Sequence, residues 1–193
     1  MAIQQSTPHT KLFIQMSGRP GSGKSTLSRL LRSSINGVVI DHDILRSPLL
    51  ESNIPFNQAA KLAYTQQWRL AEDFAKQGVE NIIIDSPCNY QEVLEQGSTC
   101  AKRFGYTFWY IECQIEDAEM LERRLQNREP MTSQRTGIEA PPAAVLGGCV
   151  DEDAREVLRK WTKVPCRPDE NTVLVDSAGD LVVLRDYILQ QIV

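Results

Sequence analysis

The pattern of apolar and polar positions divides the chain into five short apolar runs, separated by longer segments with apolar residues every three or four positions. Short apolar runs are typical of buried strands, and the wider spacing is typical of amphipathic helices. The pattern predicts strands over 12–16, 37–40, 81–85, 107–111 and 172–175. It predicts helices directly after residue 26 and over 56–77, 91–104, 117–128, 151–161 and 180–191.

The alternation of strands with helices indicates the fold class. Such an order is typical of a parallel, doubly wound α/β sheet with helices on both faces, in which ligands bind at the carboxyl ends of the strands. The run 81–85 is almost wholly apolar, as expected for a strand covered on both faces. With 193 residues, the chain has room for one well-cored domain. We expect this domain over 11–193, after a flexible polar arm over 1–10.

The segment between the first strand and the first helix carries the most specific motif. It reads Gly18-Arg19-Pro20-Gly21-Ser22-Gly23-Lys24-Ser25-Thr26 and fits the P-loop pattern of Gly, any four residues, and Gly-Lys-Ser. A strand that enters a helix through a glycine-rich turn aims backbone N–H groups and the positive end of the helix dipole at one point, which suits a polyphosphate. Lys24 would reach the outer phosphates, and the Ser25 hydroxyl would bind Mg²⁺. We therefore predict nucleoside triphosphate binding by Gly18, Pro20, Gly21, Ser22, Gly23, Lys24, Ser25 and Thr26.

Two carboxylates and an arginine follow the second predicted strand. Phosphoryl transfer to a hydroxyl needs a group that orients and deprotonates that hydroxyl, and we interpret Asp43 as this base. Asp41 would hold a metal-bound water or the substrate, and Arg46 would bind an anionic or polar part of the acceptor. The alternative is that Asp41 or Asp43 is a helix N-cap and that the arginine is an unrelated surface residue.

Asp85 ends the third predicted strand, where P-loop proteins place the carboxylate that holds Mg²⁺ through water. A cap or turn residue is the alternative interpretation. The segment 86–90 then turns out of the sheet, and we expect its Asn89 to bind the acceptor.

A charged segment followed by a proline- and glycine-rich segment predicts a lid over about 120–150. Arg124 and Arg128 lie one turn apart, which would place them on the same face of the predicted helix. A helix beside a flexible basic segment that contains Arg135 suits a lid that closes on ATP and supplies positive charge to the γ-phosphate. The alternative is a solvated helix whose arginines pair with neighbouring glutamates.

Composition indicates which partners and which cellular compartment the protein has. The net charge of −4 argues against broad electrostatic binding to nucleic acid. The five cysteines form no Cys-x-x-Cys pair, which favours a reducing compartment. The first residues do not resemble a secretory signal, and no apolar run approaches the roughly 20 residues that a membrane helix needs. We expect a cytoplasmic protein that contacts a small-molecule acceptor and no membrane. Nothing in the sequence specifies its oligomeric state.

These motifs resemble the small P-loop kinases of the nucleotide-kinase-like group, which include gluconate, shikimate, adenylylsulfate and polynucleotide kinases and the zeta toxin-like ATP-binding kinases. Asp43-Ile44-Leu45-Arg46 is similar to the Asp-x-x-Arg element of the group, whose aspartate is the acceptor base. Asp85 is similar to its third-strand aspartate, and Arg124 and Arg128 to its lid arginines. The resemblance implies a five-stranded parallel sheet in the order 2-3-1-4-5, with a mobile lid.

The segment after the third strand departs from this group. Many relatives have Asp-Ala-Thr-Asn at that point, whereas this chain has Asp85-Ser86-Pro87-Cys88-Asn89. The substrate of a relative therefore cannot be carried over.

The motifs together favour an ATP-dependent kinase that moves the γ-phosphate of ATP to a hydroxyl of a small metabolite, with Mg²⁺. Two alternatives share this chemistry: a polynucleotide or RNA 5′-hydroxyl kinase, and a nucleoside (mono)phosphate kinase. A third, of another class, is a nucleotide-dependent regulatory switch that has no acceptor.

Overall fold

The computed structural model of the protein describes residues 10–140, 142, 144 and 166–193. Its strands are β1 (Leu12–Gly18), β2 (Val38–Asp41), β3 (Asn81–Asp85), β4 (Thr107–Gln114) and β5 (Thr172–Asp176). Its helices are α1 (Lys24–Ile35), α2 (His42–Glu51), α3 (Phe56–Lys76), α4 (Gln91–Phe104), α5 (Ala118–Gln126) and α7 (Leu181–Ile192). The predicted helix over 151–161 and all but the last residue of the predicted arm lie outside the described residues.

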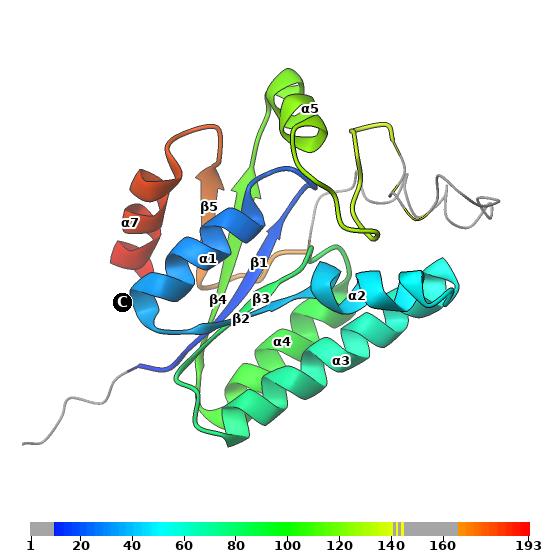
Figure 1. Ribbon diagram of the computed structural model, residues 1–193. Coiled ribbons are helices and arrows are strands. Elements are labelled where there is room, and N and C mark those ends of the chain that lie inside the picture. The colour runs from blue at the N-terminus through cyan, green and yellow to red at the C-terminus, as the bar shows by residue number, and fades with distance from the viewer. Residues whose placement is uncertain (1–9, 141, 143, 145–165) are drawn as a thin grey trace, which may run out of the picture.

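The five strands form one parallel sheet in the order β2-β3-β1-β4-β5, which confirms the predicted fold class and strand order (Figure 1). The central strand β1 pairs with β3 on one side and with β4 on the other, so that Leu12 lies opposite both Asn81 and Thr107. Because all strands run the same way, the residues that end β1, β2 and β3 meet at one edge of the sheet.

Alternate residues of each strand pack against different helices, because successive side chains of a strand point to opposite faces. Ile14 and Ile83 belong to a core that includes residues of α1 and α7. Phe13 and Ile82 belong to a second core that includes residues of α3 and α4. Burial of each such side chain stabilises the fold by roughly 1.5–3 kcal/mol. The sheet is therefore covered on both faces, as predicted, with α1 and α7 on one face and α3 and α4 on the other (Figure 1).

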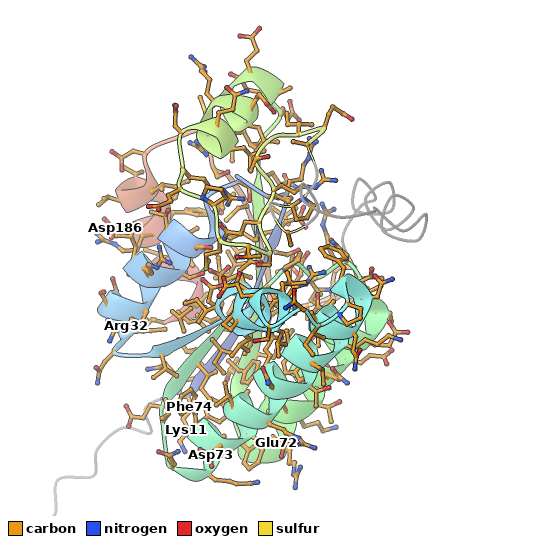
Figure 2. All side chains as sticks on the ribbon, turned by 45° about the vertical axis from the view of Figure 1, so that its right-hand side comes forward. Lys11, Arg32, Glu72, Asp73, Phe74 and Asp186 are labelled. Carbon is orange, nitrogen blue, oxygen red and sulfur yellow. The ribbon has the colours of Figure 1, made fainter. Side chains whose placement is uncertain are left out.

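Charged side chains lie on the outside of these layers (Figure 2). Arg32 and Asp186 project on the side of α1 and α7, and Glu72 and Asp73 project from α3. Glu72 contacts Arg103 of α4 at 3.3 Å, an ion pair that joins neighbouring helices at the surface. In the described part of the chain, no helix is both long enough and apolar enough to cross a membrane.

The helix α2 is the one described helix that the apolar pattern does not predict. It begins directly after β2, and the Asp41 side chain caps its first turn by accepting a hydrogen bond from the Asp43 backbone N–H at 2.9 Å. It also contains Pro48, a residue that is unfavourable inside helices. α2 packs against α3, and this contact compensates for its weak local signal.

Candidate active site

A cleft of about 1540 Å³ lies at the carboxyl edge of the sheet. It is lined by the ends of four strands, by the turn before α1, by α2 and α3, and by residues of the segment after α5. The cleft brings together nearly all of the residues that the sequence singles out. The set is Gly18, Pro20, Gly21, Gly23, Lys24, Ser25, Thr26, Asp41, Asp43, Arg46, Asp85, Asn89, Arg124, Arg128 and Arg135.

The turn between β1 and α1 has a backbone that requires glycine at two points. Gly18 has a φ of +125°, and a Cβ there would lie 2.2 Å from the carbonyl oxygen of Cys113. Gly23 is the N-cap of α1 and has a φ of +89°, in the left-handed region that favours glycine. The first N–H groups of α1 have no partner within the helix, so this turn presents donors and the positive end of the helix dipole to the cleft. Both are suited to phosphate.

Lys24 and Ser25 face the carboxylate that ends β3. Lys24 Nζ donates a hydrogen bond to the Arg19 carbonyl oxygen at 3.0 Å. Asp85 is buried, and its Oδ2 has no hydrogen-bond partner among the described residues. Burial raises the pKa of Asp85, while the charge of Lys24 and the hydroxyl of Ser25 counteract the rise. A buried carboxylate oxygen without a donor, beside a hydroxyl, fits a site for a hard cation such as Mg²⁺.

Asp41 is buried beside two other carboxylates. Burial is the largest cause that raises its pKa from 3.8 to about 6, and the negative charges of Asp85 and Asp43 add to it. Its Oδ2 lies 3.9 Å from a guanidinium nitrogen of Arg29, whose side chain is exposed. Asp41 is thus the N-cap of α2, which was the alternative interpretation of its sequence position, and it also lines the cleft.

Asp43 is held on both of its carboxylate oxygens by the segment that follows α5. The Ser133 hydroxyl donates to Oδ1 at 2.7 Å, and the Gln134 amide donates to Oδ2 at 3.0 Å. These partners lie about 90 residues away along the chain, and sequence reasoning did not find them. The contact places the segment predicted to form a lid directly on the predicted base.

Arg46 is buried on the α3 side of the cleft. Its guanidinium lies over the Phe56 ring at 4.0 Å and donates to the Phe56 carbonyl oxygen at 3.3 Å. Its Nε has no hydrogen-bond partner among the described residues. Burial lowers the pKa of Arg46, and the charge of Asp43 opposes this. Arg46 is therefore not the unrelated surface residue of the alternative interpretation.

Arg124 and Arg128 both line the cleft, but they lie on different elements and have different hydrogen-bond partners. Arg124 of α5 donates to the Ser177 carbonyl oxygen at 2.9 Å, and its Nη1 lies 3.9 Å from the Cβ position of Gly23. Because α5 ends at Gln126, Arg128 lies beyond the helix, and the prediction of one shared helical face is wrong. Arg128 instead donates to the Arg135 carbonyl oxygen at 2.8 Å.

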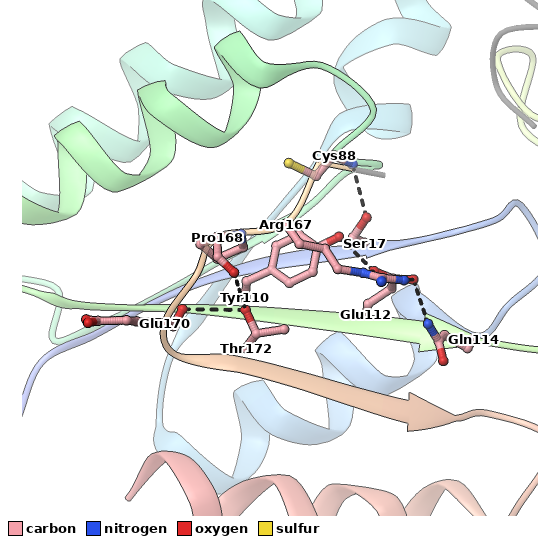
Figure 3. Close-up of polar contacts among 9 residues, drawn as sticks. All are labelled: Ser17, Cys88, Tyr110, Glu112, Gln114, Arg167, Pro168, Glu170 and Thr172. Carbon is pink, nitrogen blue, oxygen red and sulfur yellow. Dashed lines mark hydrogen bonds and ion pairs between the residues drawn. The ribbon is translucent and has the colours of Figure 1, made fainter. Parts of the chain in front are cut away.

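A second polar network lies on the β4 side of the cleft and was not predicted (Figure 3). Glu112 is buried and accepts two hydrogen bonds from Arg167, at 2.7 and 2.8 Å. Tyr110 and Gln114 donate to the same carboxylate, each at 3.0 Å. Burial by itself would raise the pKa of Glu112, but the hydrogen bonds from Arg167, Gln114 and Tyr110 outweigh it and lower the pKa. Glu112 and Arg167 both line the cleft.

The sequence model of the AAA domain matches residues 13–145, which is more than half of the chain. The chain belongs to the AAA domain family. The match covers β1 from Phe13 onward, the P-loop turn, α2 and the segment that contacts Asp43. A comparison with curated proteins gives no match.

Solved structures resemble this AAA domain protein over nearly its whole length. A provisionally named kinase from Chloroflexus aurantiacus has a TM-score of 0.67 at 16% identity, covering 96% of this chain and 97% of that chain. A gluconokinase from Sinorhizobium meliloti has a TM-score of 0.58 at 16% identity, covering 93% and 90%. The APS kinase of Mycobacterium tuberculosis, solved with AMPPNP and APS, has a TM-score of 0.58 at 15% identity, covering 96% and 98%. The fold is thus that of the small P-loop kinases, as the sequence resemblance implies.

Proposed function

We propose that the protein is an ATP-dependent phosphotransferase that moves the γ-phosphate of ATP to a hydroxyl group of a small molecule, with Mg²⁺. One observation carries the proposal: a single cleft joins the P-loop residues Lys24 and Ser25 to the carboxylates of Asp85 and Asp43. Phosphoryl transfer needs these parts together, because it depends on positioned phosphates, neutralised charge and an oriented nucleophile.

The β1–α1 turn would bind the phosphates of ATP. Its backbone N–H groups and Lys24 would contact them, and Arg124 lies close enough to Gly23 to add positive charge at the same place. Ser25 and Asp85 would hold Mg²⁺, which neutralises charge on the transferred phosphate. The unpartnered Asp85 Oδ2 supports this assignment.

Asp43 would act on the acceptor hydroxyl. The hydroxyl oxygen attacks the γ-phosphorus, the bond from that phosphorus to the bridging oxygen of ADP breaks, and the hydroxyl proton passes to the Asp43 carboxylate. Arg46 and Asn89 line the same cleft and would bind polar or anionic groups of the acceptor. Arg128 would add positive charge near Asp43. Burial lowers the pKa of Arg128, and the negative charge of Asp43 opposes this.

A specific feature of this part of the cleft favours an acceptor with a planar ring, such as a nucleoside or nucleotide. Four aromatic side chains line it, namely Phe56, Tyr64, Trp68 and Tyr90. Arg46 covers one face of Phe56 and His42 lies against Tyr64, so Tyr90, which is 40% exposed, is the most open of these rings. Aromatic rings stack well on other planar rings, whereas an open-chain polyol offers them no flat surface. A nucleoside or nucleotide kinase is therefore our second candidate.

A screen of hydroxylated metabolites, sugars and nucleosides with labelled ATP and Mg²⁺ would test the proposal. We expect labelled phosphate to appear on one acceptor class. Asp43→Asn should abolish this transfer while ATP binding, measured by calorimetry, stays intact; Lys24→Ala should weaken ATP binding itself. ATP hydrolysis that no acceptor stimulates would favour the nucleotide switch instead, and absence of ATP binding would reject the proposal.

A further inference from the structure

One face of α2 carries three polar side chains spaced by four residues, Asp43, Ser47 and Glu51, which we term the α2 polar strip. Residues four apart on a helix lie on the same face. The segment 132–134 docks along this strip. The Thr132 hydroxyl donates to Glu51 at 2.6 Å, and Ser133 exchanges hydrogen bonds with Ser47.

The docking ends at the candidate base. Ser133 is buried, and its hydroxyl receives a hydrogen bond from Ser47 while it donates to Asp43 Oδ1. Gln134 donates to the other oxygen, Oδ2. Both oxygens of the carboxylate are therefore fixed by side chains that belong to another part of the chain. A carboxylate with one donor on each oxygen cannot rotate freely about its last bond.

We propose that Ser133 and Gln134 are positioning residues that orient the Asp43 carboxylate, so that the base is complete only when segment 132–134 is docked on the α2 polar strip. The proposal rests on the proposed function, in which Asp43 is the base. Orientation of a reacting group contributes strongly to rate, because a small error in its angle misplaces the proton transfer. If the lid carries the donors that orient the base, proton transfer to Asp43 can occur only after the lid has closed.

Hydrogen–deuterium exchange of the full-length protein tests the contact without any ligand. Asp43→Asn leaves one acceptor oxygen for the two donors of Ser133 and Gln134, and Gln134→Glu replaces the donor facing Asp43 with an oxygen. Each single variant should speed exchange of the 131–135 amides about tenfold. The double variant exchanges donor and acceptor, so the new amide on α2 can donate to the new carboxylate on the docked segment, and protection should return toward the wild type. If the double variant exchanges faster than either single one, the contact does not hold the segment.

Kinetics with the acceptor found in the screen test the effect on the base. Gln134→Glu and Ser133→Ala should each lower kcat about tenfold and leave the KM for ATP within about twofold. Thr132→Val is the matched control, because it removes a docking hydrogen bond that does not touch Asp43. We expect it to keep kcat within about twofold.

The outcomes separate the two proposals. If Thr132→Val lowers kcat as much as Gln134→Glu while its 131–135 amides stay protected, the donors on Asp43 do not set the rate and the positioning role is wrong. If exchange behaves as expected but no acceptor is phosphorylated, the contact stands and the kinase assignment fails. If phosphate transfer occurs but neither Ser133→Ala nor Gln134→Glu changes kcat, the kinase assignment stands and the positioning role fails.

Discussion

Replacement of Asp41 with asparagine should stabilise the protein at neutral pH. The pKa of Asp41 is raised to about 6 from 3.8, first by burial and then by the charges of Asp85 and Asp43. Because the folded protein binds this proton more tightly than the unfolded chain does, stability falls as the pH rises from 3.8 to about 6. The difference between the two pKa values corresponds to roughly 3 kcal/mol against folding at pH 7.

Asparagine removes the charge and keeps the cap. Its side-chain oxygen can still accept the hydrogen bond from the Asp43 backbone N–H, and asparagine is as good an N-cap as aspartate. The variant loses the contact with Arg29 at 3.9 Å, which is worth at most about 1 kcal/mol because the arginine is exposed. Asp41→Asn should therefore raise the free energy of unfolding by about 2 kcal/mol near pH 7.5 and by much less near pH 4.5.

Urea unfolding followed by tryptophan fluorescence, at several pH values between about 4.5 and 7.5 and in EDTA, measures this difference. His42 titrates in an overlapping range, because burial lowers its pKa to about 4. The effect of His42 on stability has the opposite sign to that of Asp41. His42 is present in both the wild type and the variant, so its effect cancels when their free energies of unfolding are subtracted. Asp169→Asn, at an exposed position, is the control and should change stability little. A difference for Asp41→Asn that stays constant across the pH range would refute the reasoning.

Three further perturbations test other parts of the site. Glu112→Gln should lower the free energy of unfolding by about 1.5–3 kcal/mol at pH 7, because Arg167 loses its charged partner. Since the pKa of Glu112 is lowered in the folded protein, this deficit in urea unfolding should shrink as the pH falls; a deficit that grows would contradict the assignment. Gly18→Ala should destabilise the protein by more than about 2 kcal/mol, because its Cβ would overlap the Cys113 carbonyl. An unchanged Tm would show that the turn can rearrange. Asp85→Asn should weaken ATP binding about tenfold with Mg²⁺ but not in EDTA, as measured by calorimetry. Equal weakening in both buffers would argue against a metal ligand.

The parts of the fold that the sequence predicts are those with a strong local signal. The apolar run at 81–85 and the glycine-rich turn that leads into α1 each specify their structure within a few residues, and the structure agrees with both. The strand order came from the resemblance to the small P-loop kinases rather than from the pattern itself. α2 was not predicted because it is short and contains Pro48, so that its stability comes from the cap at Asp41 and from packing on α3.

The parts of the site that the sequence does not predict depend on contacts between distant residues. Arg167 lies 55 positions from Glu112, and Ser133 lies 90 from Asp43. One signal was available for the first pair. A glutamate in the largely apolar strand β4 needs a partner when it is buried, although the sequence does not say which residue provides it. Arg128 was placed on the wrong element because helix ends are set by local contacts that periodicity does not report.

The hydrogen bond from Lys24 to the Arg19 carbonyl oxygen has a consequence for ligand discrimination. If a phosphate oxygen accepts the hydrogen bond of the Lys24 ammonium, it replaces the neutral Arg19 carbonyl oxygen as acceptor. The net binding free energy is then the difference between the two hydrogen bonds and not the full value of one. That difference is large for an acceptor with concentrated negative charge and close to zero for an uncharged one. Under the proposed function, Lys24 would therefore favour highly charged polyphosphate groups and would add little to the binding of neutral analogues of the same shape.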